Sequence, residues 1–411
     1  MKLSSLSCKS PQNGRLSRRR LAFLAVVALV VAISVPSFAA EWSVVPSLST
    51  KAYYNDNLLL TPLPHDPTYG YWISPGVEFA GKTERLEVSG KAALDFVDYY
   101  GGEPSRFTNV FLPLTMKYRT ERDEWGFTGG FTRDNTLMGE LLTTGVVLRF
   151  TQRNLWTVNP TWTRMLTEKL SVQSSLQFND ASYQDGLRLG LLDYQLYGGS
   201  AGFLYHLTER DDVQLAGSYT NFRTVNGSFG LRAYYPGAML SLTHIFTEDI
   251  KATIYGGPRF LNSTSQSVGI TQSSRDTIWV YGMGLTKGFE TSSIQFTIGR
   301  EIFPLGVGLL VQTDRIGMLA SYTISESVTA SFDASGYFVT GATSLAGGSL
   351  FPSSTLLYLT PKLTWKFSER VRLDASYTYG WRDGETLPDP TMSNAMVLML
   401  TYYPLKISVA N

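Results

Sequence analysis

Hydrophobic and polar residues alternate one by one along most of this chain. In the run 371–382 the odd positions carry Val, Leu, Ala, Tyr, Tyr and Trp, whereas the even positions carry Arg, Asp, Ser, Thr, Gly and Arg. The runs 170–179, 294–299 and 328–335 follow the same pattern. Because a β-strand turns successive side chains to opposite faces, each run predicts a strand with one apolar and one polar face. We expect strands of roughly 10–14 residues, longer than the roughly 5–6 usual in soluble proteins and sufficient to cross a bilayer at a tilt.

A short polar motif that pairs Thr or Ser with Glu recurs between these runs, at intervals of roughly 36 to 47 residues. A fixed period of this size indicates that one supersecondary unit is repeated. Because Ser, Thr and acidic residues favour tight turns, each copy predicts a short turn between two strands. The eight copies begin at Thr83, Thr120, Thr167, Thr208, Thr247, Glu290, Ser325 and Phe367.

Longer segments rich in Gly, Ser, Pro, Asn and Asp separate the other ends of the predicted strands. Turns on one side and loops on the other predict an all-β fold, a transmembrane antiparallel up-and-down β-barrel of about 18 strands, with about 16 as the close alternative. A soluble propeller would need four strands per repeat, and a β-helix would need closer turns, so neither fits repeats with room for two long strands. The expected loops are 55–70, 101–107, 184–192, 226–232, 262–275, 341–353 and 383–391.

Charges and aromatic residues predict which face of each strand meets lipid. Tyr and Phe precede most of the short turns, as expected for rings at a membrane–water boundary. A lipid-facing charge near the middle of the bilayer costs about 2–4 kcal/mol. The row of Arg372 and Asp374 is therefore expected to face the lumen, and the row of Val371 and Tyr377 to face lipid.

Residues 1–40 have the composition of a secretory signal peptide. Arginines precede the apolar stretch 21–35, and the small residues that follow predict cleavage after Ala39 or Ala40. An N-terminal anchor helix is the alternative, but the stretch is short for a membrane span. Cleavage removes the only cysteine and changes the formal net charge from +1 to −5, which leaves no disulfide and no basic surface for nucleic acid. We expect residues 41–411 to form the outer-membrane β-barrel.

Several short stretches together have a familiar form. The segment 42–49 leads into Tyr54-Asn55-Asp56-Asn57-Leu58, and Tyr183-Gln184-Asp185 and Leu192-Asp193-Tyr194 follow, alongside the repeated Thr-Glu-Arg turns. These features resemble an outer-membrane β-barrel family associated with PEP-CTERM/exosortase systems and exopolysaccharide operons. The resemblance covers most of the mature chain. It implies a Gram-negative outer-membrane location and a role near exopolysaccharide production or export, and it brings no catalytic residues.

Candidate catalytic and metal-binding residues are few. His206 and His244 precede short turns, where a ring at the membrane boundary is the expected role. His65 lies beside Asp66 in the first loop, and the cluster 55–57 has closely spaced oxygens, but Ca²⁺ takes about six to eight ligands, and an Asx turn explains the cluster. The sequence shows neither a hydrolase pairing of Ser with His nor a metal-ligand spacing. We expect no enzyme, no cofactor and no metal.

Charged residues on the expected inner wall are the candidates for contact with a solute. One interpretation is a path for a polar or anionic solute, in which arginines face phosphate or carboxylate groups. The other is mutual pairing that only satisfies charges inside a wide barrel. Tyrosines near the loops, such as Tyr53 and Tyr99, are either sugar-stacking rings or an aromatic girdle. The candidate lumen-lining residues are Lys91, Asp95, Arg149, Arg153, Arg223, Arg300, Arg315, Asp333, Lys362, Lys366, Asp374 and Arg382, together with Glu301.

Three hypotheses for function follow. The first is a conduit or assembly factor for exopolysaccharide at the cell surface, which rests on the family resemblance. The second is a general diffusion or solute-selective porin, which an inward-folded loop would favour. The third is a structural or adhesion barrel with a plugged lumen. Expected partners are outer-membrane lipid, the barrel assembly machinery that recognises an aromatic closing strand such as 396–403 and, for export, polysaccharide and periplasmic export components.

Overall fold

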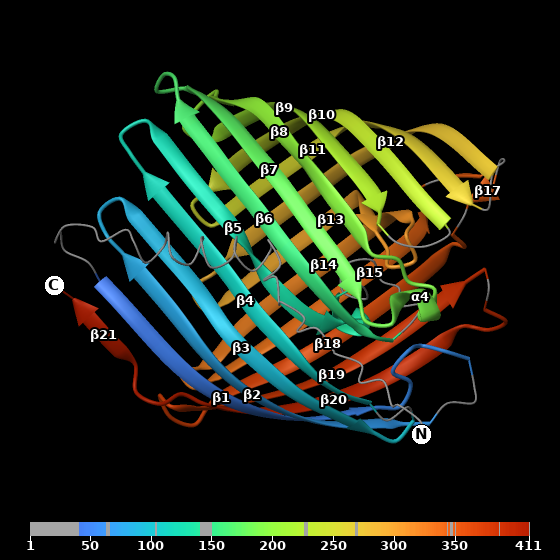
Figure 1. Ribbon diagram of the computed structural model, residues 1–411. Helices are drawn as coiled ribbons and strands as arrows, with labels where there is room; N and C mark the ends of the chain where they lie inside the picture. Colours follow the sequence, from blue (N-terminus) through green and yellow to red (C-terminus); the bar gives the residue numbers. More distant parts are fainter. Residues whose placement is uncertain are drawn as a thin grey trace, which may run out of the picture.

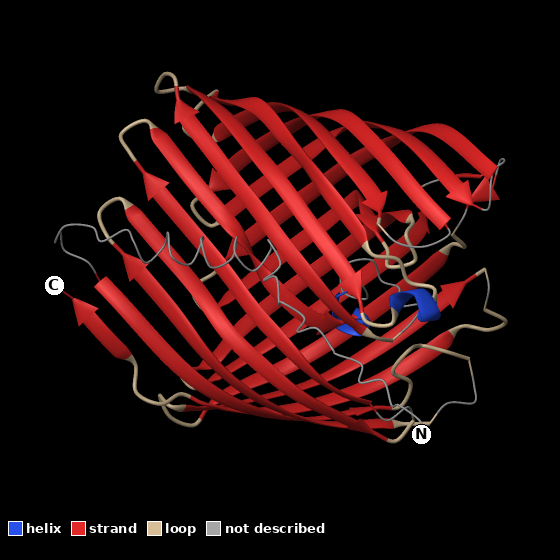
Figure 2. Cartoon of the chain, viewed as in Figure 1, coloured by secondary structure: helices blue, strands red, loops and turns tan. Residues whose placement is uncertain are grey.

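A computed structural model describes residues 41–62, 66–102, 105–139, 150–225, 229–267, 270–342, 344–345, 348–349, 351–385 and 387–410. The expected signal peptide lies outside these ranges. Eighteen antiparallel strands form one closed barrel (Figure 1). Strands make up nearly all of the wall, and two short helices lie at one end of it (Figure 2). The barrel prediction and the higher of the two predicted strand numbers are therefore confirmed.

The strands are longer than those of most soluble sheets, as the alternation predicts. They are β1 (Glu41–Asn55), β2 (Thr68–Lys82), β3 (Leu86–Tyr100), β4 (Ser105–Arg119), β5 (Asp123–Asn135), β6 (Gln152–Met165), β7 (Leu170–Tyr183), β8 (Tyr194–His206), β9 (Asp211–Thr224), β10 (Phe229–Thr247), β11 (Ile250–Ser267), β12 (Ile270–Gly288), β13 (Ser292–Pro304), β14 (Leu310–Ser325), β15 (Val328–Gly341), β18 (Ser354–Lys366), β19 (Val371–Gly384) and β20 (Thr391–Tyr402). The remaining elements are the short helices α2 (Thr136–Gly139) and α4 (Gly186–Leu189), the loop hairpin of β16 (Ser344–Leu345) and β17 (Gly348–Ser349), and the terminal strand β21 (Ile407–Ala410).

The two ends of the chain meet to close the barrel. One edge of β1 pairs with β2, and the other edge pairs with β20 from Leu48 opposite Tyr402 to Asn55 opposite Ala395. Residues 403–406 interrupt this ladder, and β21 then resumes it against the first four residues of β1. Closure matters because an unpaired backbone edge is too costly within the hydrocarbon of a bilayer.

All eight predicted turns connect consecutive strands at one end of the barrel, opposite the end that carries α4 and β17 (Figure 1). Their hydroxyl residues close the turns. Thr83 Oγ1 accepts a hydrogen bond from the Leu86 amide at 3.0 Å, and Ser325 Oγ accepts one from the Val328 amide at 3.2 Å. Similar bonds form at Thr120 and other copies, which explains why a hydroxyl residue recurs there.

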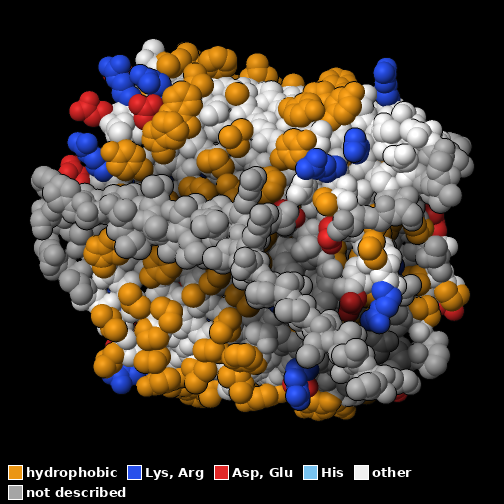
Figure 3. Space-filling view, viewed as in Figure 1, with side chains coloured by type: hydrophobic (Ala, Val, Ile, Leu, Met, Phe, Trp, Pro, Cys, Tyr) orange, Lys and Arg blue, Asp and Glu red, His pale blue; other side chains and the backbone are white. Residues whose placement is uncertain are grey.

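Alternation separates an apolar outer face from a polar inner face. The outward side chains of Trp42, Trp279 and Leu398 are 47%, 61% and 52% exposed. Where Figure 3 leaves the outer wall in view, hydrophobic side chains cover much of it, and charged side chains gather toward its ends. Inward positions are polar by contrast, as where the hydroxyls of Ser49 and Thr401 lie 3.0 Å apart across the closing seam.

One predicted loop is wrong. The sequence predicts a loop at 262–275, but β11 continues to Ser267 and β12 begins at Ile270. Within this hairpin the hydroxyls of Thr264 and Ser273 lie 3.1 Å apart on neighbouring strands. A strand that extends beyond the apolar band is polar on both faces, so its composition resembles that of a loop although its backbone continues the sheet.

Candidate functional site

The inner wall carries a cluster of charges around Asp374 on β19. The Asp374 carboxylate accepts hydrogen bonds from Lys362 Nζ at 3.1 Å, Arg372 Nε at 3.0 Å and Thr364 Oγ1 at 2.7 Å. The Asp374 side chain is 6% exposed, whereas Lys362 and Arg372 remain 42% and 35% exposed. Because two cations share one carboxylate, the cluster retains a net positive charge on its lumen side.

Further cations extend this cluster along the same side of the barrel. Arg315 on β14 lies over the ring of Tyr337 at 5.5 Å, and Lys51 on β1 lies 3.4 Å from the ring centroid of Trp72. Arg382 on β19 donates a hydrogen bond to a serine hydroxyl at 3.3 Å. An aromatic ring or a hydroxyl holds a cation in place without neutralising its charge.

These inward cations form a surface that we call the basic wall. It spans the adjacent strands β14, β15, β18, β19, β20 and β1. By the alternation of faces, the inward carboxylates on the same strands are Asp333, Asp374 and, at the turn end, Glu41. The basic wall consists of Lys51, Arg315, Lys362, Lys366, Arg372 and Arg382.

The inward charges on β2 to β6 are arranged differently, because each inward cation there has a carboxylate partner. Lys91 Nζ lies 3.0 Å from a Glu78 carboxylate oxygen. Arg153 lies 2.8 Å from Asp134, with side-chain exposures of only 8% and 7%. Glu124 accepts bonds from two cations of β4 at 2.8 and 2.9 Å. This second part of the wall matches the expectation of mutual pairing and has little charge to offer a solute.

The strands across the lumen from β18 and β19 are β7 to β9, and their inner face is mostly neutral. Gln214 Nε2 donates to Gln173 Oε1 at 2.9 Å, and the hydroxyls of Ser175 and Ser200 lie 2.8 Å apart. The lumen therefore has a basic side and a side of amides and hydroxyls.

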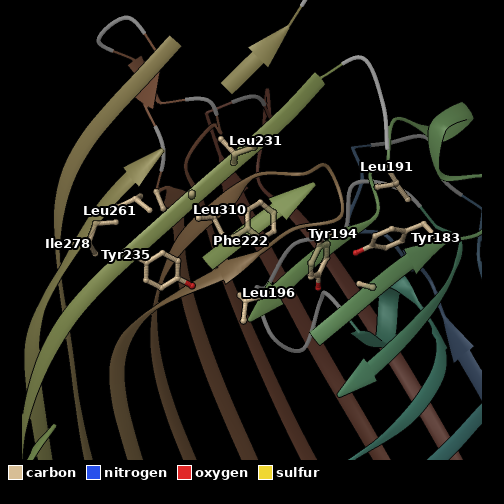
Figure 4. Close-up of a cluster of buried hydrophobic side chains, with 13 residues drawn as sticks. Tyr183, Leu191, Tyr194, Leu196, Phe222, Leu231, Tyr235, Leu261, Ile278 and Leu310 are labelled. Atoms are coloured by element: carbon tan, nitrogen blue, oxygen red, sulfur yellow. The ribbon is translucent and has the colours of Figure 1, made fainter. Parts of the chain in front are cut away.

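An apolar cluster occupies part of the barrel at the loop end (Figure 4). The inward side chains of Phe222, Leu231 and Leu261 are at most 1% exposed, although they belong to wall strands. Two loops fold over them, and the Leu192 amide of one loop donates to the Gly306 carbonyl of the other at 2.6 Å. We call Phe222, Leu231 and Leu261, together with the buried apolar residues that pack on them, the mouth cluster. The inward loops narrow the barrel at the loop end, where Leu305 of the second loop also packs with Val311 of β14 and Val339 of β15.

A second group at the loop end consists of aromatic rings that pack on one another. Tyr99 contacts Tyr53, Trp72, Phe107 and Phe150, with ring centroids 5.6–6.3 Å apart. Trp72 and Tyr99 are only 8% and 3% exposed. These rings therefore serve mainly as a packed cluster, and they offer little free surface to stack on a sugar.

Most of the predicted lumen-lining residues lie on the inner face. Each has inward-facing residues as its register partners on the neighbouring strands. Arg149 lies outside the described residues. The inward residues are Lys91, Asp95, Arg153, Glu301, Arg315, Asp333, Lys362, Lys366, Asp374 and Arg382.

Two predicted residues, Arg223 and Arg300, lie on the outer face instead. Arg300 Nε is 2.6 Å from Asp314 on β14, and its guanidinium lies over the outward ring of Tyr281 at 5.3 Å. Arg223 is exposed and donates to Gln195 at 2.7 Å. Side chains alternate along β13, and its even-numbered residues, such as Ile294 and Ile298, face outward. Arg300 therefore faces outward and Glu301 inward. Both positions lie near the loop ends of their strands, where an outward charge avoids the hydrocarbon.

Sequence reasoning missed Lys51 and Arg259 on the inner wall. Lys51 has the same parity as the inward Tyr53, and Arg259 bonds to the inward Ser218 on β9. Strict alternation was the signal that would have identified both residues. The contact between the inward loops had no comparable signal.

Among the described residues, no helix is long and apolar enough to cross a membrane. Within the same residues, no group of three or more His, Cys, Asp or Glu side chains could hold a metal ion.

Neither a protein-family model nor a curated protein matches the chain. Among solved structures, the chain is similar to OccAB3 of Acinetobacter baumannii, at 10% identity over 89% of this chain and 99% of that one, with a TM-score of 0.43. It is also similar to OccAB4 of the same organism (10% identity, 90% and 99% coverage, TM-score 0.45). A third similar structure is OccK5 (OpdH) of Pseudomonas aeruginosa (12% identity, 88% and 98% coverage, TM-score 0.42).

The closed sheet, the apolar exterior and the polar interior identify the chain as a membrane-spanning β-barrel of the outer-membrane type. Closure satisfies the backbone within lipid, and the outward hydrophobic band matches the surface that such barrels present.

Proposed function

We propose that this barrel is a diffusion channel for small hydrophilic solutes, with a preference for anions. The observation that carries the proposal is the basic wall, where six inward cations face the lumen beside three carboxylates. A lumen wall with an excess of one charge raises the local concentration of the opposite charge, because low-dielectric walls focus the field.

The two sides of the lumen have complementary roles. Anionic groups of a solute are attracted to Arg315, Lys362 and Arg382, which keep exposed or half-exposed side chains. Amides and hydroxyls on β7 to β9 can replace hydrogen bonds that the solute loses with water. Several weak sites in succession allow a solute to enter and also to leave.

The inward loops support a channel for small solutes more than a wide conduit. The mouth cluster fills part of the cross-section at the loop end, and apolar side chains pack it tightly. The exopolysaccharide conduit stays a prediction that rests on the family resemblance, since the aromatic rings near the mouth are largely buried by one another.

Uptake into liposomes tests the proposal. Proteoliposomes that contain the folded barrel are placed in gluconate, sorbitol or glucosamine, which are similar in size and differ in charge, and swelling rates are compared. We expect gluconate to enter fastest. The variant R315Q/K362Q/R382Q should lose this preference, whereas R106Q, which removes an outward arginine, should keep it. Fastest entry by glucosamine, or no entry through a folded barrel, would contradict the proposal. Block by an anionic polysaccharide at low concentration would favour the conduit.

A further inference from the structure

Three arginines lie on the outer face at the loop end of β9, β10 and β12. Arg223, Arg232 and Arg275 are all exposed. Arg223 and Arg232 are direct register partners across β9 and β10, so their side chains project outward side by side. Arg275 lies two strands further, opposite Asn262. We call these three residues the arginine patch.

The arginine patch has no carboxylate partner among the residues that the structure describes. Arg223 donates two hydrogen bonds to Gln195 Oε1, at 2.7 and 3.1 Å, and no ion pair forms at Arg232 or Arg275 within the described ranges. Two other outward arginines near the same end differ, since Arg106 is paired with Asp98 and Arg300 with Asp314. Like charges directly opposite across two strands repel each other. The pair Arg223–Arg232 therefore favours an external anion between its guanidinium groups.

The residues beneath the arginine patch place it at the level of lipid headgroups. The neighbouring outward positions toward the membrane are Asn221 and Tyr234. Asn262 lies between Tyr234 and Arg275 as the register partner of both, and the rings of Tyr219 and Tyr234 stack with centroids 6.4 Å apart. Below them follow Phe260 and the outward Trp279, which are 49% and 61% exposed. Tyr and Trp rings prefer the boundary between headgroups and hydrocarbon. The guanidinium groups thus lie just beyond the apolar band.

We propose that the arginine patch binds the phosphate groups of a glycolipid in the membrane leaflet at the loop end of the barrel. Guanidinium groups bind phosphate oxygens through paired, charge-assisted hydrogen bonds. The amides of Asn221 and Asn262 and the Tyr234 hydroxyl lie where sugar hydroxyls of such a headgroup would be. The acyl chains would lie along Phe260 and Trp279. This binding is independent of solute passage, because all of these residues face away from the lumen.

Native mass spectrometry of the folded full chain tests the proposal. The probe is a glycolipid with a glucosamine disaccharide that carries two phosphates, and the comparison is the same lipid after enzymatic removal of both phosphates. We expect the wild type to bind the phosphorylated lipid at least tenfold more tightly. The variant R223Q/R232Q/R275Q should lose this difference. The variant R106Q, which removes a paired outward arginine, should retain it.

Two results would overturn the proposal. One is equal affinity of the triple variant and the wild type for the phosphorylated lipid. The other is binding of inorganic phosphate to the patch as tightly as the lipid binds, seen as displacement of the lipid by an equal concentration of phosphate. That result would make the patch a simple anion site. Heat-modifiable migration in gels verifies that each variant is folded. Unchanged liposome swelling in the triple variant would show that lipid binding and solute passage are separate properties.

Discussion

The ammonium group of Lys362 on β18 lies 3.1 Å from the carboxylate of Asp374 on β19, which Arg372 also contacts at 3.0 Å. The carboxylate is almost buried in the wall, whereas both cations reach the lumen. Asp374 therefore holds two positive groups in place and cancels only one of their charges. Loss of this one acidic side chain would change the net charge of the basic wall by as much as loss of any one of its cations.

Asp374→Asn should make the channel more selective for anions and the barrel less stable. Removal of the carboxylate adds a net positive charge to the basic wall. It also replaces a carboxylate that serves two cations and the Thr364 hydroxyl by an amide with a single acceptor oxygen, a loss of about 1–3 kcal/mol. Reversal potentials and urea unfolding measure the two effects. Asp333→Asn is the matched control, since Asp333 is exposed and accepts one bond from Ser335 at 2.9 Å. It should change selectivity with little loss of stability, and a cation-selective D374N channel would contradict the account.

Arg153→Met should be strongly destabilising, because it leaves the carboxylate of Asp134 buried without its partner. Breaking a buried pair costs about 3–5 kcal/mol, whereas replacing both partners by apolar residues is often near neutral. The double variant R153M/D134L should therefore unfold at higher denaturant than R153M alone. Fluorescence-detected urea unfolding in lipid compares the three proteins. A double variant less stable than the single one would show that the pair does more than neutralise itself.

Gly308→Val should widen the mouth of the barrel. Gly308 has a φ of +78°, and a Cβ there would lie 2.7 Å from Leu192 Cδ1 and 2.9 Å from Thr224 Cγ2. The added side chain should push the loop 305–309 away from its neighbour and raise the single-channel conductance. Gly190→Val is the control for backbone strain, since Gly190 has a φ of +74° and nothing within 4 Å of an added Cβ. Equal conductance in G308V and wild type would mean that the mouth cluster does not limit flow.

The topology predicts opposite accessibility at the two ends of the barrel. An epitope tag inserted after Asp389, in the loop between β19 and β20, should bind antibody on intact cells. A tag inserted after Glu369, in the short turn between β18 and β19, should bind only after the outer membrane is permeabilised. The reverse labelling pattern would show that the barrel is inserted the other way round.

Alternation predicted more of this protein than any motif did. A strand that must face lipid on one side and water on the other has to alternate, so the runs at 170–179 and 371–382 predicted both strands and orientation. The same rule applied strictly would have placed Arg300 outside and Lys51 inside. Charge alone made Arg223 and Arg300 candidates for the lumen. Both lie outside instead, because an outward charge near the end of a strand avoids the hydrocarbon.

The loop end was the least predictable part. Segments 262–267 and 270–275 are strand in spite of their polar composition, because both of their faces lie beyond the apolar band. In the mouth cluster, Leu191 and Val307 of two distant loops pack with Phe222 of a wall strand. No local pattern encodes such contacts, since each loop is apolar only at isolated positions. The shared contact of Lys362 and Arg372 with Asp374 likewise could not be predicted, because it depends on the pairing register of β18 and β19.

The reversal potential across a planar bilayer tests the central claim most directly. The folded mature barrel is inserted, and a tenfold KCl gradient is applied. We predict a reversal potential whose sign shows that chloride permeates better than potassium. The reversal potential should shift toward zero in R315Q/K362Q/R382Q and stay unchanged in R106Q. A wild-type channel that prefers potassium, or a triple variant as anion-selective as the wild type, would show that the basic wall does not line the path of permeating ions.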